Sequence, residues 1–193
     1  MLAGLLFAGH ALATEVGQAA PDFSLEDLGG KVVKLSDLRG RVVVLEWFNP
    51  GCPFVRASHT RGTLVGEATR QISKGVLWFA VNSAAPGKQG FGVDANRAAA
   101  REYHMNYPVL LDESGAVGKA FGATNTPGMF VIDREGRLVY RGAIDNSPDG
   151  ERDAPEGGVL VDYVASALED LAAGRPVRYS ETPQYGCSVK YGP

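Results

Sequence analysis

The chain has 193 residues, 45% of them hydrophobic and 21% charged, a composition that is ordinary for a soluble globular protein. This length suits a single domain with a sizeable core. The formal net charge of −3 gives no general attraction to nucleic acid or to an anionic membrane, so neither is an expected partner. After the first residues no segment is apolar for long enough to span a bilayer, and stable membrane insertion of the mature protein is not expected.

The first residues resemble the end of a secretory signal peptide. An apolar run over 2–8 precedes Ala11-Leu12-Ala13, an A-x-A cleavage pattern, and a polar segment follows. Cleavage near Ala13 would make the mature protein periplasmic or secreted, in an oxidising compartment where two cysteines can persist as a disulfide. A basic n-region is missing, so either the true start lies upstream or the signal is atypical. A frayed hydrophobic N-terminus is the alternative. We therefore divide the chain into a signal remnant over 1–13 and one domain over 14–193.

Hydrophobic periodicity predicts strands and helices in alternation along the first part of the chain. Two short strands, over 22–25 and 32–35, should form an N-terminal hairpin around Gly29-Gly30. The next elements are a buried strand over 42–48, a helix over 53–72, a buried strand over 75–81 and a helix over 93–104. A strand over 107–111 is expected at an edge, because Pro108 cannot donate to a strand ladder.

The second part of the chain predicts a short helix, a hairpin and a final helix with a tail. These elements are expected over 116–121, over 129–132 with 138–143, and over 160–173, with a polar loop over 145–158. The tail over 176–193 contains no long regular element. This order predicts an α/β fold, a central mixed β-sheet flanked by helices on both faces.

Cys52 is the candidate nucleophile, because it stands where a buried strand runs into a helix. Asn49, Pro50 and Gly51 end the strand, and Pro53 suits the first turn of the helix. A thiol at this junction faces unpaired backbone N–H groups and the positive end of the helix dipole, which both favour the thiolate. An inert, small core residue is the alternative.

The segment from Trp47 to Val55 resembles the active site of thioredoxin-fold redoxins, the branch of alkyl-hydroperoxide-reductase-like and periplasmic thiol–disulfide oxidoreductase proteins. Cys52 matches the attacking cysteine of their C-x-x-C, and Val55 stands in place of the second cysteine. Thr126-Pro127, about 75 residues later, resembles the cis-proline that lies against the attacking sulfur in this fold. The resemblance covers roughly 17–144, which would be the core, followed by a helix and a cysteine-bearing tail over 159–193.

Two residues are candidates to assist Cys52. The resemblance implies that Glu46 is a buried proton acceptor during thiol exchange, and burial disfavours the charged form of a carboxyl. A solvent-facing glutamate, or one paired with an arginine, is the alternative. Arg56 lies one helical turn after Cys52, where a guanidinium would stabilise a thiolate unless it is a solvated helix residue.

Other polar residues are not assigned to the site. His59 is interpreted as a surface or groove residue, because it lies roughly 10 Å along the helix axis from Cys52. His104 and Met105 would need a third metal ligand that the sequence does not reveal. Two distant cysteines without a C-x-x-C argue against structural zinc, and neither a cofactor nor a metal is expected.

Three function classes stay open. In a thiol–disulfide oxidoreductase, the Cys52 thiolate would attack a protein or small-molecule disulfide, and Cys187 in the tail or an external thiol would resolve the mixed disulfide. In a peroxiredoxin-type thiol peroxidase with antioxidant activity, Cys52 would attack peroxide. The resemblance speaks against this class, because Asn49 and Leu45 stand where peroxiredoxins carry Thr or Ser and Pro. In a non-catalytic binding domain, Cys52 and Cys187 would form a structural disulfide.

Overall fold

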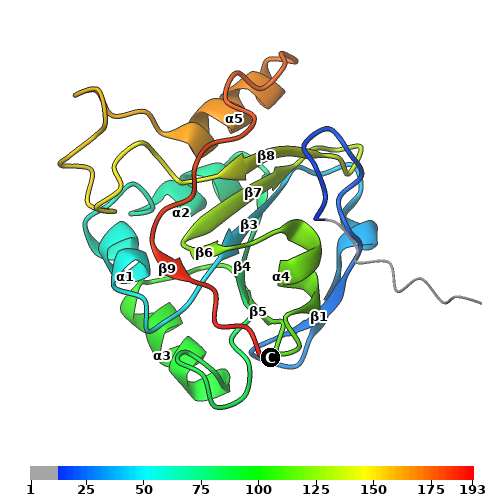
Figure 1. The fold of residues 1–193 in the computed structure, drawn as a ribbon. Helices are drawn as coiled ribbons and strands as arrows, with labels where there is room; N and C mark the ends of the chain where they lie inside the picture. The colour runs from blue at the N-terminus through cyan, green and yellow to red at the C-terminus, as the bar shows by residue number, and fades with distance from the viewer. Residues whose placement is uncertain (1–12) are drawn as a thin grey trace, which may run out of the picture.

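The computed structural model describes residues 13–193, so nearly all of the predicted signal segment lies outside the described residues. Its centre is a mixed sheet of seven strands in the order β2-β1-β5-β4-β3-β7-β8 (Figure 1). These strands are β1 (Ser24–Asp27), β2 (Val32–Lys34), β3 (Val43–Trp47), β4 (Leu77–Asn82), β5 (Val109–Leu111), β7 (Gly128–Ile132) and β8 (Leu138–Gly142). Strands β3, β4 and β5 are parallel, and the other pairs are antiparallel. The predicted α/β fold with a central mixed sheet is confirmed.

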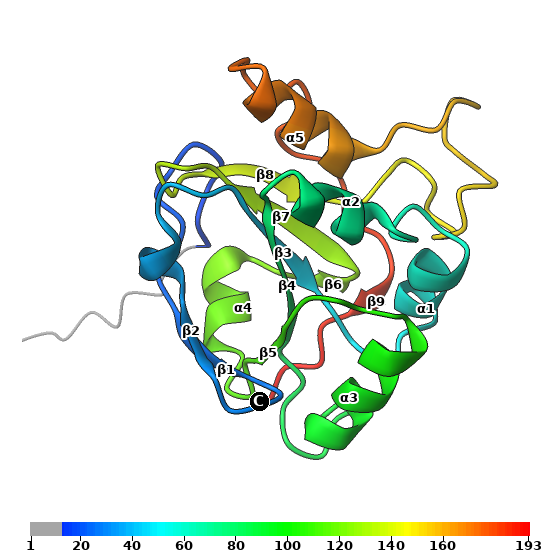
Figure 2. The ribbon, with the colours of Figure 1, turned by 180° about the vertical axis from the view of Figure 1, so that it is seen from behind.

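Helices cover both faces of this sheet. They are the 3₁₀ helix η1 (Leu35–Leu38) and the α-helices α1 (Pro53–Thr60), α2 (Glu67–Ser73), α3 (Val93–Glu102), α4 (Ala116–Phe121) and α5 (Tyr163–Ala172). Helix α4 packs on one face (Figure 1), and α2 and α5 pack on the other, which Figure 2 shows from behind. In the described part of the chain, no helix is both long and apolar enough to traverse a bilayer.

The central strand β3 determines which side chains meet each helix layer. All five of its residues are buried. Leu45 and Trp47 pack with Phe121 of α4, whereas Val44 packs with α2 and α5 on the opposite face. Because side chains alternate along a strand, Glu46 points to the same face as Val44. A carboxyl group is thus directed into the interior next to the end of the strand.

The single helix predicted over 53–72 is wrong, because the chain breaks it between Thr60 and Glu67. A Cβ on Gly62 would collide with the carbonyl oxygen of Gly150 and with the backbone of Ser58. Gly66 has a φ of +71°, which L side chains rarely adopt. The two glycines permit the turn that separates α1 from α2.

The edge position predicted for the strand over 107–111 is also wrong. Strand β5 lies inside the sheet, with β4 on one side and β1 of the N-terminal hairpin on the other. Pro108 precedes the strand, so its missing N–H interrupts no ladder, and its carbonyl accepts a hydrogen bond from Ala80 N at 3.0 Å. The added hairpin converts this edge into an interior position.

Candidate active site

Cys52 lies at the N-terminus of α1, where strand β3 has just ended. It is the N-cap residue of α1, and Pro53 occupies the first turn. Its side chain is 1% exposed. The thiol donates a hydrogen bond to the carbonyl oxygen of Thr126, 3.1 Å from Sγ. The predicted strand-to-helix junction therefore holds Cys52 in the interior, against a segment 74 positions later in the chain.

The Cys52 sulfur lies against the carbonyl of Thr126, the residue that precedes Pro127. The bond between Thr126 and Pro127 is cis, as the sequence predicted. Thr126 ends the short strand β6 (Asn125–Thr126), which is not part of the seven-stranded sheet. Its partner is β9 (Cys187–Ser188) from the C-terminal tail, and the two strands form a separate antiparallel pair.

The tail brings Cys187 directly to Cys52. In the antiparallel register Cys187 lies opposite Thr126. Its side chain is half-buried and packs against the apolar cluster that contains Cys52, Val55 and Phe48. Both cysteines are free thiols. Figure 1 shows β9 next to β6, with α1 on its other side.

Contact with Cys187 changes the acidity of both thiols. Burial opposes ionisation of Cys52, but hydrogen bonds from the Cys187 thiol, the Thr126 side chain and the Val55 N–H more than offset it. The pKa of Cys52 therefore lies below its ordinary value. Burial, together with the hydrogen bond to Cys52 and its negative charge, raises the pKa of Cys187 to about 11. The pair thus favours a thiolate on Cys52 and a neutral thiol on Cys187.

The structure places Arg56 at the surface. Its guanidinium pairs with Glu102 of α3 at 3.0 Å, and both side chains are largely exposed. The groups that lower the pKa of Cys52 are instead the Cys187 thiol, the Thr126 side chain and the Val55 N–H. The expected thiolate-stabilising role of Arg56 stays a prediction.

Glu46 lies in a buried polar cluster that sequence reasoning recognised only in part. Its carboxylate accepts hydrogen bonds from Tyr107 Oη at 3.0 Å and from Trp78 Nε1 at 3.5 Å. The third partner is His59 Nε2, 2.7 Å from Glu46 Oε1. The carboxyl itself is fully buried, and its partners come from α1, β4 and the segment before β5.

The interpretation of His59 as a surface or groove residue is wrong, because the side chain is 4% exposed. Its ring stacks on Tyr103 with centroids 5.1 Å apart, while Nε2 meets Glu46. His59 lies four residues after Val55, which is fully buried, so both occupy the inner face of α1. This four-residue spacing was the signal in the sequence from which the burial of His59 could have been predicted.

Asn49, the residue at the peroxiredoxin Thr/Ser position, is engaged within its own loop. Its Oδ1 accepts from Gly51 N at 2.8 Å, and its Nδ2 donates to the carbonyl of Gln89 at 3.0 Å. Gln89 returns a hydrogen bond to the carbonyl of Gly51. The amide thus holds the loop before Cys52 in shape.

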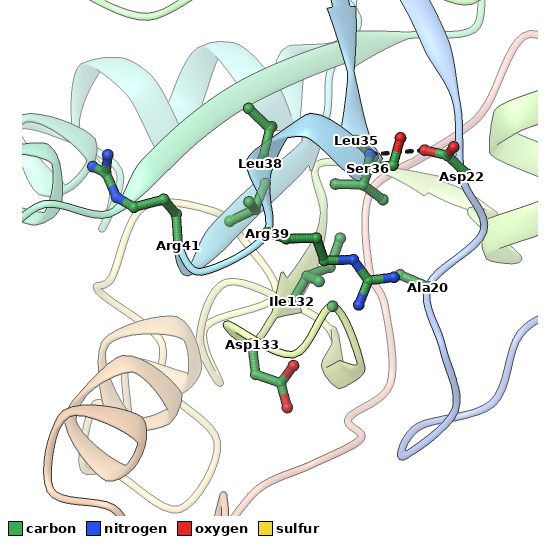
Figure 3. Close-up of a pocket in the computed structure, with 11 residues that line it drawn as sticks. Ala20, Asp22, Leu35, Ser36, Leu38, Arg39, Arg41, Ile132 and Asp133 are labelled. Atoms are coloured by element: carbon green, nitrogen blue, oxygen red, sulfur yellow. Dashed lines mark hydrogen bonds between the residues drawn. The ribbon is translucent and has the colours of Figure 1, made fainter.

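Other regions of the described chain do not converge on Cys52. A pocket beside η1 is lined by Asp22, Arg39, Asp133 and their neighbours, and Asp22 accepts there from Ser36 N at 2.8 Å (Figure 3). It includes Val43, the first residue of β3, and so lies at the opposite end of that strand from Cys52. Over residues 13–193, no three His, Cys, Asp or Glu side chains gather as a metal site.

A mixed sheet that presents a cysteine at a helix N-terminus, against a cis-proline segment, defines a thioredoxin-fold redoxin. The family model described as Redoxin matches residues 15–156. The chain belongs to the redoxin family.

Similar proteins agree with this assignment. The chain is 32% identical to the thiol-disulfide oxidoreductase ResA of Bacillus subtilis over 134 residues, which are 69% of this chain and 70% of that protein. An uncharacterized conserved protein from Geobacillus kaustophilus superposes with a TM-score of 0.79 and 32% identity, covering 93% of both chains. A DsbE-type thiol:disulfide interchange protein of Chlorobium tepidum superposes with a TM-score of 0.55 and 28% sequence identity. The superposition covers 67% of this chain and 85% of that one. The protein is a thiol-dependent oxidoreductase of the thioredoxin-like redoxin class.

Proposed function

We propose that the protein exchanges thiols and disulfides through Cys52 and Cys187, with Cys52 as the attacking thiolate and Cys187 as the resolving thiol. The observation that carries this proposal is the position of Cys187, which packs on the cluster that contains Cys52 and lies opposite Thr126, the residue whose carbonyl the Cys52 thiol contacts. A lone cysteine exchanges disulfides poorly, because nothing in the protein resolves the mixed disulfide. Val55 occupies the position of the second cysteine of C-x-x-C, and Cys187 supplies the missing resolving thiol instead.

The reaction has two displacement steps. The Cys52 thiolate attacks one sulfur of a substrate disulfide, the S–S bond breaks, and the other substrate sulfur leaves as a thiolate. Cys187 then loses its proton and attacks the Cys52 sulfur of the mixed disulfide. The Cys52–Cys187 disulfide forms, and the second substrate thiol is released. Two electrons pass from the protein to the substrate, and the reverse sequence would oxidise a dithiol.

The neighbouring residues have separate roles in this proposal. Thr126, whose carbonyl accepts from the Cys52 thiol, would bound together with Pro127 the space in which the sulfurs meet in line. Glu46 would move a proton during exchange. The charge of Arg56 contributes little, since it is paired with Glu102 and screened by solvent.

The substrates in this proposal are disulfides and thiols of proteins or small molecules. Relatives bear the names thiol-disulfide oxidoreductase and thiol:disulfide interchange protein, which agree with that chemistry. We place the mature protein outside the cytoplasm, as the A-x-A pattern at 11–13 suggests. N-terminal sequencing of the protein from fractionated cells would test this placement.

Single-cysteine variants test the exchange chemistry. Reduction of a disulfide-linked fluorescent peptide by the reduced protein should be abolished in Cys52→Ser. In Cys187→Ser the reaction should stop at a mixed disulfide between Cys52 and the peptide. Peptide mass mapping would identify this trapped species. Ser188→Ala is the matched control, because it alters the same exposed tail strand and keeps both thiols.

Two outcomes would contradict the proposal. Exchange that survives in Cys52→Ser would exclude Cys52 as the attacking group. Full turnover in Cys187→Ser would assign the resolving step to an external thiol. Non-reduced digests of the oxidised protein should contain a peptide that links Cys52 to Cys187.

A further inference from the structure

The C-terminal tail occupies the free backbone edge next to Cys52. Among described residues, β6 pairs in the sheet assignment with β9 alone. The pairing continues beyond Ser188, because Val189 N donates to the carbonyl of Thr124 at 2.9 Å. The side chain of Asn125 also donates to the carbonyl of Gly186 at 3.1 Å. The tail therefore follows this edge on both sides of Cys187.

The docked tail prevents the sulfur of a substrate from reaching the Cys52 sulfur. Cys52 is 1% exposed, and Cys187 packs against the apolar cluster that contains it, opposite Thr126 in the strand pair. Attack on an outside disulfide needs a third sulfur in line with the bond that breaks. In this arrangement the neighbouring sulfur position is already held by Cys187.

Resting on the proposed function, we propose that β9 occupies the substrate's place. In this proposal, an extended polypeptide segment that carries a disulfide-bonded cysteine pairs with β6 when residues 186–190 undock. The substrate cysteine then lies opposite Thr126, where Cys187 now lies. The returning tail resolves the mixed disulfide and displaces the substrate strand from the same edge.

The chemistry of the edge indicates a polypeptide as the partner. The tail is held there by backbone groups, such as the carbonyl of Thr124 and those of the β6–β9 register pairs, and by the side chains of Asn125 and Gln184. Any extended chain offers the same alternation of N–H and C=O groups, so a strand can be added whatever its sequence. A small disulfide without a backbone cannot compete for these groups.

Contacts on either side of residues 186–190 would hold the rest of the tail while this segment undocks. Upstream, Tyr185 Oη donates to Asp145 at 3.1 Å, and Thr182 N donates to the carbonyl of Arg141 at 3.2 Å. Downstream, Tyr191 Oη donates to the carbonyl of Ala123 at 2.7 Å. A short segment tethered at both ends returns at high effective concentration, which favours resolution after each exchange.

Gly186 offers a variant that weakens docking and leaves both thiols in place. It has a φ of +98°, and an added Cβ would collide with the carbonyl oxygen of Thr126 and lie 3.3 Å from Pro127 Cδ. Gly157→Ala is the matched control, because its φ of +80° carries the same backbone cost while nothing lies within 4 Å. The readout is the alkylation rate of Cys52 in the reduced protein, located by peptide mass mapping.

We expect Cys52 to be alkylated about tenfold faster in Gly186→Ala than in the wild type. This is the effect of a roughly tenfold larger equilibrium constant for local opening of the tail. Gly157→Ala should match the wild type. A synthetic peptide of residues 182–193 with Cys187→Ser should slow alkylation of Gly186→Ala again. The same peptide should inhibit reduction of a disulfide-linked peptide more than that of hydroxyethyl disulfide.

An unchanged Cys52 rate in folded Gly186→Ala, or a tail peptide without effect, would overturn the proposal. If the variant does not fold, hydrogen exchange of the wild type tests whether the tail opens. The Val189 amide should exchange much faster than that of Leu45 in β3, and equal protection would exclude tail opening. Alkylation and hydrogen exchange need no turnover, so they stay readable if Cys52→Ser shows the proposed function to be wrong.

Discussion

His59 Nε2 lies 2.7 Å from Glu46 Oε1, in a pair that is almost completely buried between α1 and β3. The second carboxylate oxygen is held by Tyr107 and Trp78. Tyr107 and Trp78 donate to one carboxylate oxygen of Glu46, and the His59 ring nitrogen lies within hydrogen-bond distance of the other. The pair fixes the first helix after Cys52 to the strand before it.

Removing only one member of this pair should be strongly destabilising. We expect His59→Phe to lower the free energy of unfolding by about 3 kcal/mol or more, since it leaves a buried carboxylate without its closest partner. The double variant Glu46→Met with His59→Phe should lose less than the sum of the single losses. Urea unfolding of the four proteins measures the coupling, and additive losses would contradict a direct interaction.

Cys187 should control the acidity of Cys52. Its thiol donates the hydrogen bond that helps to bring the pKa of Cys52 below its ordinary value, although burial acts in the opposite direction. Cys187→Ala should therefore raise the pKa of Cys52, whereas Cys187→Ser keeps a donor and should raise it less. Ultraviolet absorbance of the thiolate against pH reports this pKa apart from accessibility. Equal pKa values in the wild type and Cys187→Ala would contradict the assignment.

Asp162 should make the stability fall as the pH rises towards neutrality. Burial, with further contributions from the charges of Glu67 and Asp145, raises its pKa to about 7, although the N–H of Ala165 opposes this. A carboxyl whose folded pKa is raised stabilises the fold below its unfolded pKa of about 4, and this stabilisation is lost as the pH rises through the folded value.

Asp162→Asn removes this titration and keeps an N-cap residue for α5. The difference in free energy of unfolding, variant minus wild type, should be larger at pH 8 than at pH 5. For a single titrating group the increase is roughly 2 kcal/mol. Asp153→Asn, at an exposed loop position, is the control. Denaturant unfolding at the two pH values measures the difference, and a pH-independent difference would contradict the raised pKa.

Peroxide consumption should be slow compared with disulfide exchange. A peroxidase site needs a hydrogen-bonding group free to meet the peroxide, and the amide of Asn49 is already bonded to Gly51 and to the carbonyl of Gln89. A peroxide assay with an external dithiol should show little consumption, in Asn49→Thr as in the wild type. Rapid consumption that is lost in Cys52→Ser would reverse the order of the two activities.

Local signals in the sequence were sufficient for most of the elements and for the position of Cys52. The hydrophobic run before Asn49, the prolines around Cys52 and the Thr126-Pro127 pair each act over a few residues, and the structure has the strand, the helix start and the cis bond where they predicted. Such signals depend on the preferences of individual residues, which are readable without a partner. The tail was likewise expected to lack long regular structure.

The tertiary structure decided which of these pieces meet. His59 is buried because α1 packs its inner face on β3 above Glu46, and β5 is internal because the N-terminal hairpin pairs with it. Cys187 reaches Cys52 because the tail adds a strand to β6, a pairing between backbone groups that leaves no pattern in side-chain order. The sequence by itself determined the position of Cys52 between strand and helix, whereas packing and strand addition determined that Cys187 lies beside it.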